Sequence, residues 1–122
     1  MGPVNWLAVG GGWAVAALLG VAFYGRSAVR GGKPVLHLMA AVLLMSSAVM
    51  IGHMLARVGV PTLQAKPWLY FMMTGGLALT FIGPALVITA IRREGAVRVA
   101  MYDWAYWLTA YLAIGGTFLL LD

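Results

Sequence analysis

Residues 34–57 read PVLHLMAAVLLMSSAVMIGHMLAR. This stretch contains no Asp, Glu, Lys or Arg until its last residue, Arg57. A hydrocarbon core roughly 30 Å thick needs about 20 apolar residues of α-helix to cross it. The stretch therefore predicts a transmembrane helix.

Three further runs of the same kind take up most of the remaining chain, at about residues 4–24, 67–91 and 103–121. Of the 122 residues, 63% are hydrophobic and only 9% are charged, whereas a soluble domain has about 25% charged residues. We expect an all-α membrane protein in which residues 1–122 form a single domain. Its four transmembrane helices should form an up-down bundle surrounded by lipid.

Basic side chains gather in two of the predicted turns. Six of the eight Lys and Arg residues lie there, namely Arg26, Arg30, Lys33, Arg92, Arg93 and Arg98. Only Arg57 and Lys66 lie on the other side of the predicted membrane. Because cytoplasmic loops are rich in Lys and Arg, this bias predicts both termini on the non-cytoplasmic side of a bacterial inner (plasma) membrane. It also accounts for the net charge of +5 without a nucleic-acid partner.

The second span has two unlike faces when its residues are placed at 3.6 per turn. One face carries a stripe of thioether and polar side chains, namely Met39, Ser46, Met50, His53 and Arg57. We expect the stripe to face the other helices, because polar groups in hydrocarbon need partners. His37 lies on the opposite face, near the cytoplasmic end.

The expected packing faces of the other spans contain small residues. These faces are Val9, Gly12, Ala16 and Gly20 in the first span; Met72, Gly76, Thr80, Gly83 and Val87 in the third; and Tyr106, Thr109, Ala113 and Gly116 in the fourth. Small side chains allow helices to approach closely in a membrane. Pro84 should break a backbone hydrogen bond of the third helix and bend it. Trp104, Trp107, Tyr111 and Phe118 are expected to point toward lipid or a partner.

The histidines and methionines are the candidate cofactor ligands. Imidazole nitrogen and thioether sulfur can ligate haem iron or copper. Haem b and copper are therefore both possible cofactors, and the sequence firmly implies neither. His37 and His53 are about 24 Å apart along a helix and cannot share one metal. A site would combine His53 with Met50 or Met72, or pair equivalent histidines of two copies. The alternative for both is an interfacial histidine bonded to a backbone carbonyl.

Enzyme signatures are absent from the sequence. The chain has no cysteine, which excludes thiol nucleophiles and thiolate metal sites. Glu94 is expected in a turn, Asp103 at a helix start and Asp122 at the last residue, so no carboxylate is expected at mid-depth in the membrane. This pattern argues against an enzyme and against a proton-coupled antiporter.

The sequence favours a non-catalytic structural or assembly subunit of a larger inner-membrane complex, of a redox type. Its partners would be other membrane protein chains or further copies of itself. One alternative is a homo-oligomeric transporter or channel for a metal cation or small solute, lined by the second helix. A further alternative is a small b-type haem membrane protein.

Overall fold

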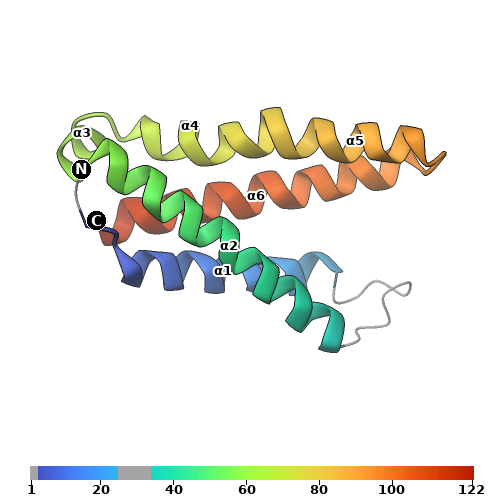
Figure 1. Cartoon of the computed structure of the whole chain (residues 1–122), viewed down its shortest axis with the longest axis horizontal. Helices are drawn as coiled ribbons and strands as arrows, with labels where there is room; N and C mark the ends of the chain where they lie inside the picture. The colour runs from blue at the N-terminus through green and yellow to red at the C-terminus, as the bar shows by residue number, and fades with distance from the viewer. Residues whose placement is uncertain (1–2, 25–33) are drawn as a thin grey trace.

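The computed structural model describes residues 3–24 and 34–122. The elements are α1 (Trp6–Tyr24), α2 (Pro34–Val58), α3 (Val60–Ala65), α4 (Trp68–Leu77), the π-helical segment η1 (Ala78–Ile82), α5 (Gly83–Arg92) and α6 (Val97–Leu121). No strand occurs in this part of the chain. Segment η1 joins α4 and α5 into one continuous rod (Figure 1). Four helices, namely α1, α2, the α4–α5 rod and α6, are long and apolar enough to cross a membrane, which confirms that prediction.

Two predicted boundaries differ from the structure. The fourth long helix begins at Val97 rather than at Asp103. The expected turn between the second and third spans contains the short helix α3, and Gly59 with φ of 96° connects it to α2. Glycine suits that connection because side chains disfavour positive φ. The basic residues of the first turn, Arg26, Arg30 and Lys33, lie outside the described residues.

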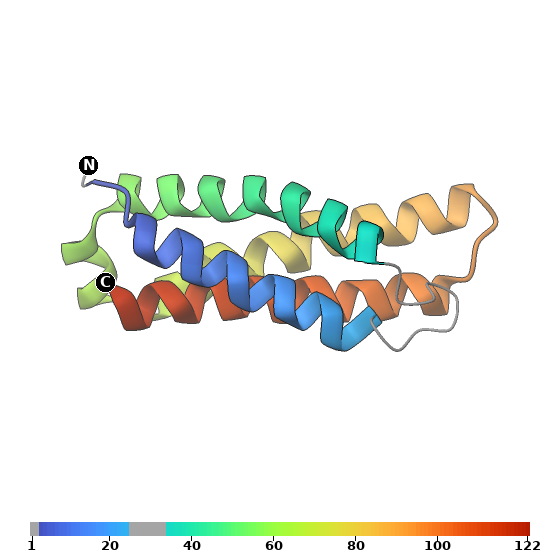
Figure 2. The ribbon, with the colours of Figure 1, turned by 90° about the horizontal axis from the view of Figure 1, so that it is seen from below.

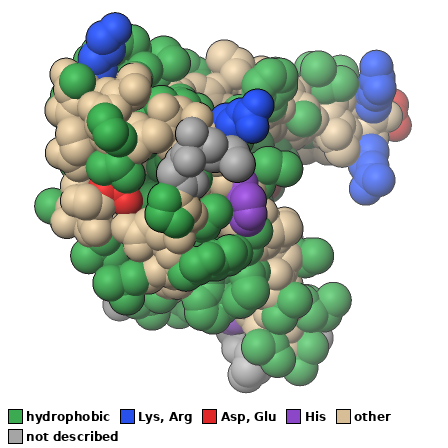
Figure 3. All heavy atoms as spheres, turned by 60° about the vertical axis from the view of Figure 1, so that its left-hand side comes forward, with side chains coloured by type: hydrophobic (Ala, Val, Ile, Leu, Met, Phe, Trp, Pro, Cys, Tyr) green, Lys and Arg blue, Asp and Glu red, His purple; other side chains and the backbone are tan. Residues whose placement is uncertain are grey.

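Helix α6 is the centre of the arrangement. It packs against α1 on one side and against the α4–α5 rod on the other, and α2 packs mainly against α1. Helix α2 meets α4 only close to α3, and no extensive contact joins α2 to α5. The bundle is therefore closed at the end that holds α3 and open at the opposite end, where α2 and α5 diverge (Figure 1). Figure 2 shows that both termini lie at the closed end. In Figure 3 the outline is hollowed between the arm carrying the α5–α6 turn and the lobe carrying the start of α2.

Glycine and alanine set the helix crossings, as expected for membrane helices. The buried residues of α1 are Ala8, Val9, Gly12 and Ala16, which matches the predicted face except that Gly20 is half-buried and Ala8 joins it. A Cβ built on Gly12 would lie 3.1 Å from Cγ2 of Ile114 in α6. A Cβ built on Gly115 of α6 would lie 2.9 Å from the carbonyl oxygen of Tyr70 in α4. Larger side chains at either position would push the helices apart.

The third span presents only part of the face that was predicted: Gly83 is buried as expected, whereas Met72 and Thr80 are exposed. Tyr70, Thr74 and Ala78 are buried at steps of four, and Gly83 follows after a step of five. The extra residue lies in the π turn, where the N–H of Gly83 bonds to the carbonyl of Ala78. This turn rotates the helix between Gly76 and Gly83, so the two glycines do not share a face. A Cβ on Gly76 would meet nothing within 4 Å.

Helix α6 is buried over more of its surface than expected. Tyr106 is buried as predicted, but Tyr111 and Phe118, expected outside, are buried too. Thr109, expected inside, is exposed. These predictions were wrong because they assumed one packing face, whereas a central helix has neighbours on both sides.

A hydrogen-bonded cluster fastens the closed end. The Asn5 side chain accepts a hydrogen bond from the N–H of Ala8 at 3.1 Å and so caps α1. Asn5 Nδ2 also donates to Asp122 Oδ1 at 2.7 Å. The hydroxyl of Tyr70, a fully buried residue, donates to Asp122 Oδ2 at 2.8 Å. Three helices are thereby tied together around one carboxylate.

Candidate functional site

The stripe on α2 faces outward, which contradicts the prediction that it lies inside the bundle. Met39 and Met50 are 57% and 60% exposed, and Ser46, His53 and Arg57 are exposed as well. The inner face of α2 is instead formed by Leu44, Ala48, Ile51 and Leu55. The two faces were separated correctly, but their assignment to inside and outside was reversed.

Local hydrogen bonds explain this reversal. The hydroxyl of Ser46 donates to the carbonyl of Leu43 at 2.7 Å, and Nδ1 of His53 lies 2.8 Å from the carbonyl oxygen of Val49. The Ser46 hydroxyl and one of the two ring nitrogens of His53 are satisfied by their own helix, so neither side chain has to face the inside of the bundle. The alanine-rich face packs more closely against α1, and Trp13 of α1 donates its indole N–H to the carbonyl of Ala41 at 2.7 Å.

His53 presents one ring nitrogen outward. Since a carbonyl oxygen only accepts, the contact requires a proton on Nδ1, and in the neutral ring this leaves Nε2 as an acceptor or ligand atom. The ring also meets the edge of Trp6, with centroids 5.7 Å apart. Four side chains share a shallow outer hollow with His53, namely Met45, Ser46, Val49 and Met50. A group on a neighbouring chain could therefore reach His53 and Met50 together.

Other predicted ligands are not brought to that hollow. Met39 and Arg57 do not line it, and Met72 is exposed on α4. Within residues 3–24 and 34–122 no three His, Asp or Glu side chains are grouped as metal ligands.

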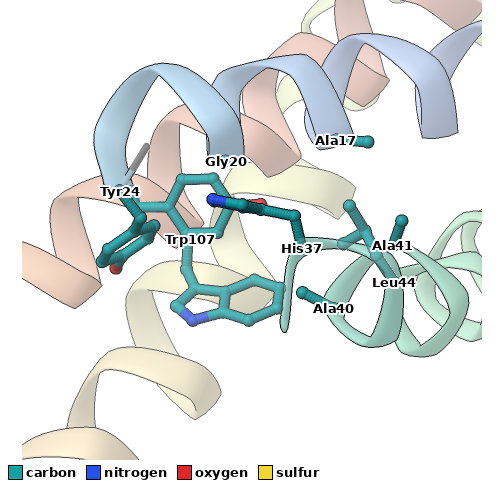
Figure 4. Close-up of a pocket in the computed structure, with 9 residues that line it drawn as sticks. Ala17, Gly20, Tyr24, His37, Ala40, Ala41, Leu44 and Trp107 are labelled. Carbon is teal, nitrogen blue, oxygen red and sulfur yellow. The ribbon is translucent and has the colours of Figure 1, made fainter. Parts of the chain in front are cut away.

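His37 faces the interior, on the opposite side of α2. It lines a cavity of about 160 Å³ between α1, α2 and α6, which we call the inner cavity (Figure 4). The other residues that line it are Ala17, Gly20, Tyr24, Ala40, Ala41, Leu44, Tyr106 and Trp107. The imidazole of His37 points into this space from α2 (Figure 4).

Aromatic rings form one wall of the inner cavity. The ring centroids of Tyr24 and Tyr106 are 5.3 Å apart with an interplanar angle of 74°. Tyr106 and Trp107 are 5.2 Å apart at 64°. Edge-to-face contacts continue outward to Phe23, Tyr102 and Tyr111. The rings support one another and give the cavity a fixed wall.

Asp103 lies directly behind this wall. The hydroxyl of Tyr24 donates to Asp103 Oδ1 at 2.5 Å, and the carboxylate is half-buried in the second turn of α6. Asp103 was not predicted to lie within the span, because the fourth helix was expected to start at this residue. The apolar pattern of Val97 and Ala100 upstream was the signal that could have placed the carboxylate within the span.

A larger groove adjoins the inner cavity. It has a volume of about 850 Å³, lies between α5 and α6, and reaches Ser47 of α2. Trp107 lines both spaces. At the inner end of the groove the hydroxyl of Tyr111 donates to Ser47 Oγ at 2.8 Å, which links α6 to α2.

In two regions of the described structure, side chains that can bind a ligand or a partner therefore lie close together. One is the stripe on the outer face of α2, and the other is the inner cavity with Asp103 behind it. Comparison with protein-family models, with curated proteins and with solved structures finds no match. The functional proposals below rest on the residues of this chain.

Proposed function

We propose that this chain is a non-catalytic membrane subunit that assembles with another membrane protein chain through the stripe of α2. The observation that carries this proposal is the exposure of the stripe on the outer face of a helix whose other face packs on α1. Among the described residues, nothing in the bundle covers this face. The partner chain would belong to a larger inner-membrane complex, of a redox type.

The chemistry of the stripe suits a protein neighbour better than lipid. Hydrocarbon tails offer no hydrogen-bond donor, whereas His53 presents an acceptor nitrogen outward. Methionine side chains such as Met39 and Met50 adapt to irregular surfaces and serve at interfaces. A neighbouring helix that supplies a donor would satisfy His53 and pack between the methionines.

The same outward face also favours a second candidate, a homo-oligomeric channel or transporter for a metal cation or small solute. Copies arranged around an axis would bring their stripes together and line a central path with Ser46, Met50 and His53. A b-type haem between two copies of His53 is a special case of this arrangement. His37 could not take part in it, because it faces the interior of its own chain.

Photo-crosslinking at two adjacent positions tests the assembly proposal. Met39 and Leu38 are both exposed, at 57% and 65%, and they differ in direction by about 100° around the helix. A benzophenone amino acid at Met39, in cells that express the protein natively, should give one discrete adduct with a different protein chain. That chain should co-purify in a fixed ratio with the wild-type protein. The same probe at Leu38 is the matched control and should label lipid.

The identity of the adduct separates the candidates. An adduct of twice the chain mass at Met39, with matching native mass in mild detergent, would replace the subunit proposal with the homo-oligomeric one. Lipid labelling at both positions would refute both candidates. Metal analysis and an absorption spectrum of the same preparation would show whether copper or haem accompanies the assembly.

We further propose that both termini lie on the non-cytoplasmic side. The start of α1 and the end of α6 lie at the same end of the molecule (Figure 1), and the Arg and Lys bias supports the direction. The chain has no native cysteine, so single cysteines report directly on exposure. Thr62→Cys should react with an impermeant thiol reagent added outside intact cells, and Gly95→Cys should react only after lysis. The reverse pattern would invert the orientation.

A further inference from the structure

We infer that the inner cavity binds a small substituted ammonium group. Three aromatic residues, Tyr24, Tyr106 and Trp107, border the cavity, and the carboxylate of Asp103 lies one hydroxyl group behind them. Neither the predicted orientation nor the assembly through α2 bears on this site, because the stripe lies on the opposite face of α2. The inference is therefore tested independently of the proposed function.

The aromatic wall is the first reason. A cation near the face of a tyrosine or tryptophan ring is attracted by the ring quadrupole, and substituted ammonium ligands are commonly held this way. Tyr106 lies between the other two rings, at 5.3 Å from Tyr24 and 5.2 Å from Trp107. Steep angles of 74° and 64° between neighbouring planes turn the rings in different directions. A ligand in the cavity can therefore meet more than one ring.

The charge distribution is the second reason. Asp103 accepts the hydroxyl proton of Tyr24 in a hydrogen bond, which shifts electron density toward the phenol ring that borders the cavity. Among the described residues that line the inner cavity there is no Lys or Arg, and His37 is the one imidazole. Among the described residues, Arg93 is the one basic side chain that lines the adjoining groove, and no ion pair joins it to Asp103. An ionisable residue within a membrane-spanning segment is a functional-site hypothesis by default.

Size is the third reason. The cavity of about 160 Å³ is close to the roughly 150 Å³ that accommodates a benzene molecule in a known engineered cavity, and a trimethylammonium group is of similar bulk. Ala17, Gly20 and Ala41 keep this space open. Trp107 lines both the inner cavity and the adjoining groove, so the two spaces lie on either side of one indole.

A pair of isosteric probes tests the inference on the unaltered protein. Choline and 3,3-dimethylbutan-1-ol have the same shape, but only choline is charged. Titration calorimetry of the full chain in a nonionic detergent should show choline binding about 3- to 30-fold more tightly, the range that cation–π contacts give. Equal binding of the two probes would show an apolar cavity only and would overturn the inference, as would no binding of choline.

Matched variants then locate the site. Asp103→Asn and Trp107→Leu should each weaken choline binding by about 3-fold or more. Asp122→Asn and Trp68→Leu alter a carboxylate and an indole at the closed end and should leave the affinity unchanged. Circular dichroism shows which variants are folded, and equal losses in all four folded variants would also overturn the inference.

The ammonium group could belong to a free solute or to a lipid head group, and vesicles distinguish the two. The protein is reconstituted in phosphatidylglycerol alone or with phosphatidylcholine, and choline is titrated into each preparation. Weaker choline binding in the phosphatidylcholine vesicles identifies the head group as the natural ligand. Unchanged binding identifies the free solute.

Discussion

Replacement of Gly83 by alanine should destabilise the bundle relative to the same replacement at Gly76. A Cβ at Gly83 would overlap the indole of Trp104, with Cε2, Nε1 and Cδ2 as its nearest neighbours. Real Cβ atoms essentially never come within 3.0 Å of a neighbour, so the ring has to move away from α5. Overpacking of this kind costs about 1–3 kcal/mol. The indole N–H is buried without an acceptor in the described part of the chain, so packing is what holds the ring in place.

Gly76→Ala is the matched control, because its Cβ would meet nothing within 4 Å. Alanine raises helix propensity by about 1 kcal/mol at either position, so this contribution cancels when the two variants are compared. The difference in unfolding free energy should then be about 1–3 kcal/mol. It can be measured by denaturant titration in mixed micelles, followed by circular dichroism.

A double-mutant cycle identifies the cause of the loss. Gly83 precedes Pro84, and a Cβ before proline is itself unfavourable in a helix. If the indole is responsible, Gly83→Ala should cost markedly less in a Trp104→Ala background. An unchanged cost would assign the loss to Pro84, and equal stability of Gly83→Ala and Gly76→Ala would refute the predicted clash altogether.

Three other changes follow from single contacts. Tyr70→Phe removes a hydrogen bond to the Asp122 carboxylate and should lower the free energy of unfolding by about 1.5–3 kcal/mol. An unchanged thermal unfolding curve in detergent would show that this bond does not stabilise the closed end. Tyr111→Phe should lower the free energy of unfolding by about 0.6 kcal/mol, the average for interhelical hydrogen bonds in membranes. Adding Ser47→Ala in the same chain should cause no further loss if the two hydroxyls bond only each other. Glu94→Gly should raise the melting temperature, because Glu94 has φ of 55° and a left-handed backbone costs residues other than glycine about 1–2 kcal/mol. A lower melting temperature would contradict this prediction.

The helical architecture could be predicted because hydrophobic length alone determines it. Each span shows as a long run without charge, and the start of α2 at Pro34 and the end of α1 at Tyr24 agree with the prediction. Membrane helices must satisfy their backbone groups internally, so few alternatives compete with four helices. The Val97 boundary was missed because Arg98 and Asp103 interrupt the apolar run that opens α6.

The packing faces were harder to predict, for two physical reasons. A regular period of 3.6 residues was assumed for the third span, whereas the π turn before Pro84 shifts every later residue by one position. Polar side chains were assumed to seek other helices, whereas Ser46 and His53 bond carbonyls of their own helix. Neither a π turn nor a local side-chain bond leaves a clear mark in a single sequence. The inner cavity was missed for the same reason, because it lies on the face that was assigned to the outside.

The central position of α6 also constrains how the protein can be made. Helices α1, α2, α4 and α5 precede α6 in the chain, yet α1 and the α4–α5 rod contact each other chiefly through α6. During synthesis the earlier helices enter the membrane with their glycine-lined surfaces still facing lipid. Those surfaces, including Gly12 and Gly83, are covered only when the segment from Val97 onward has been inserted. Ribosome stalling before that point would leave a protein that is fully inserted but not yet folded.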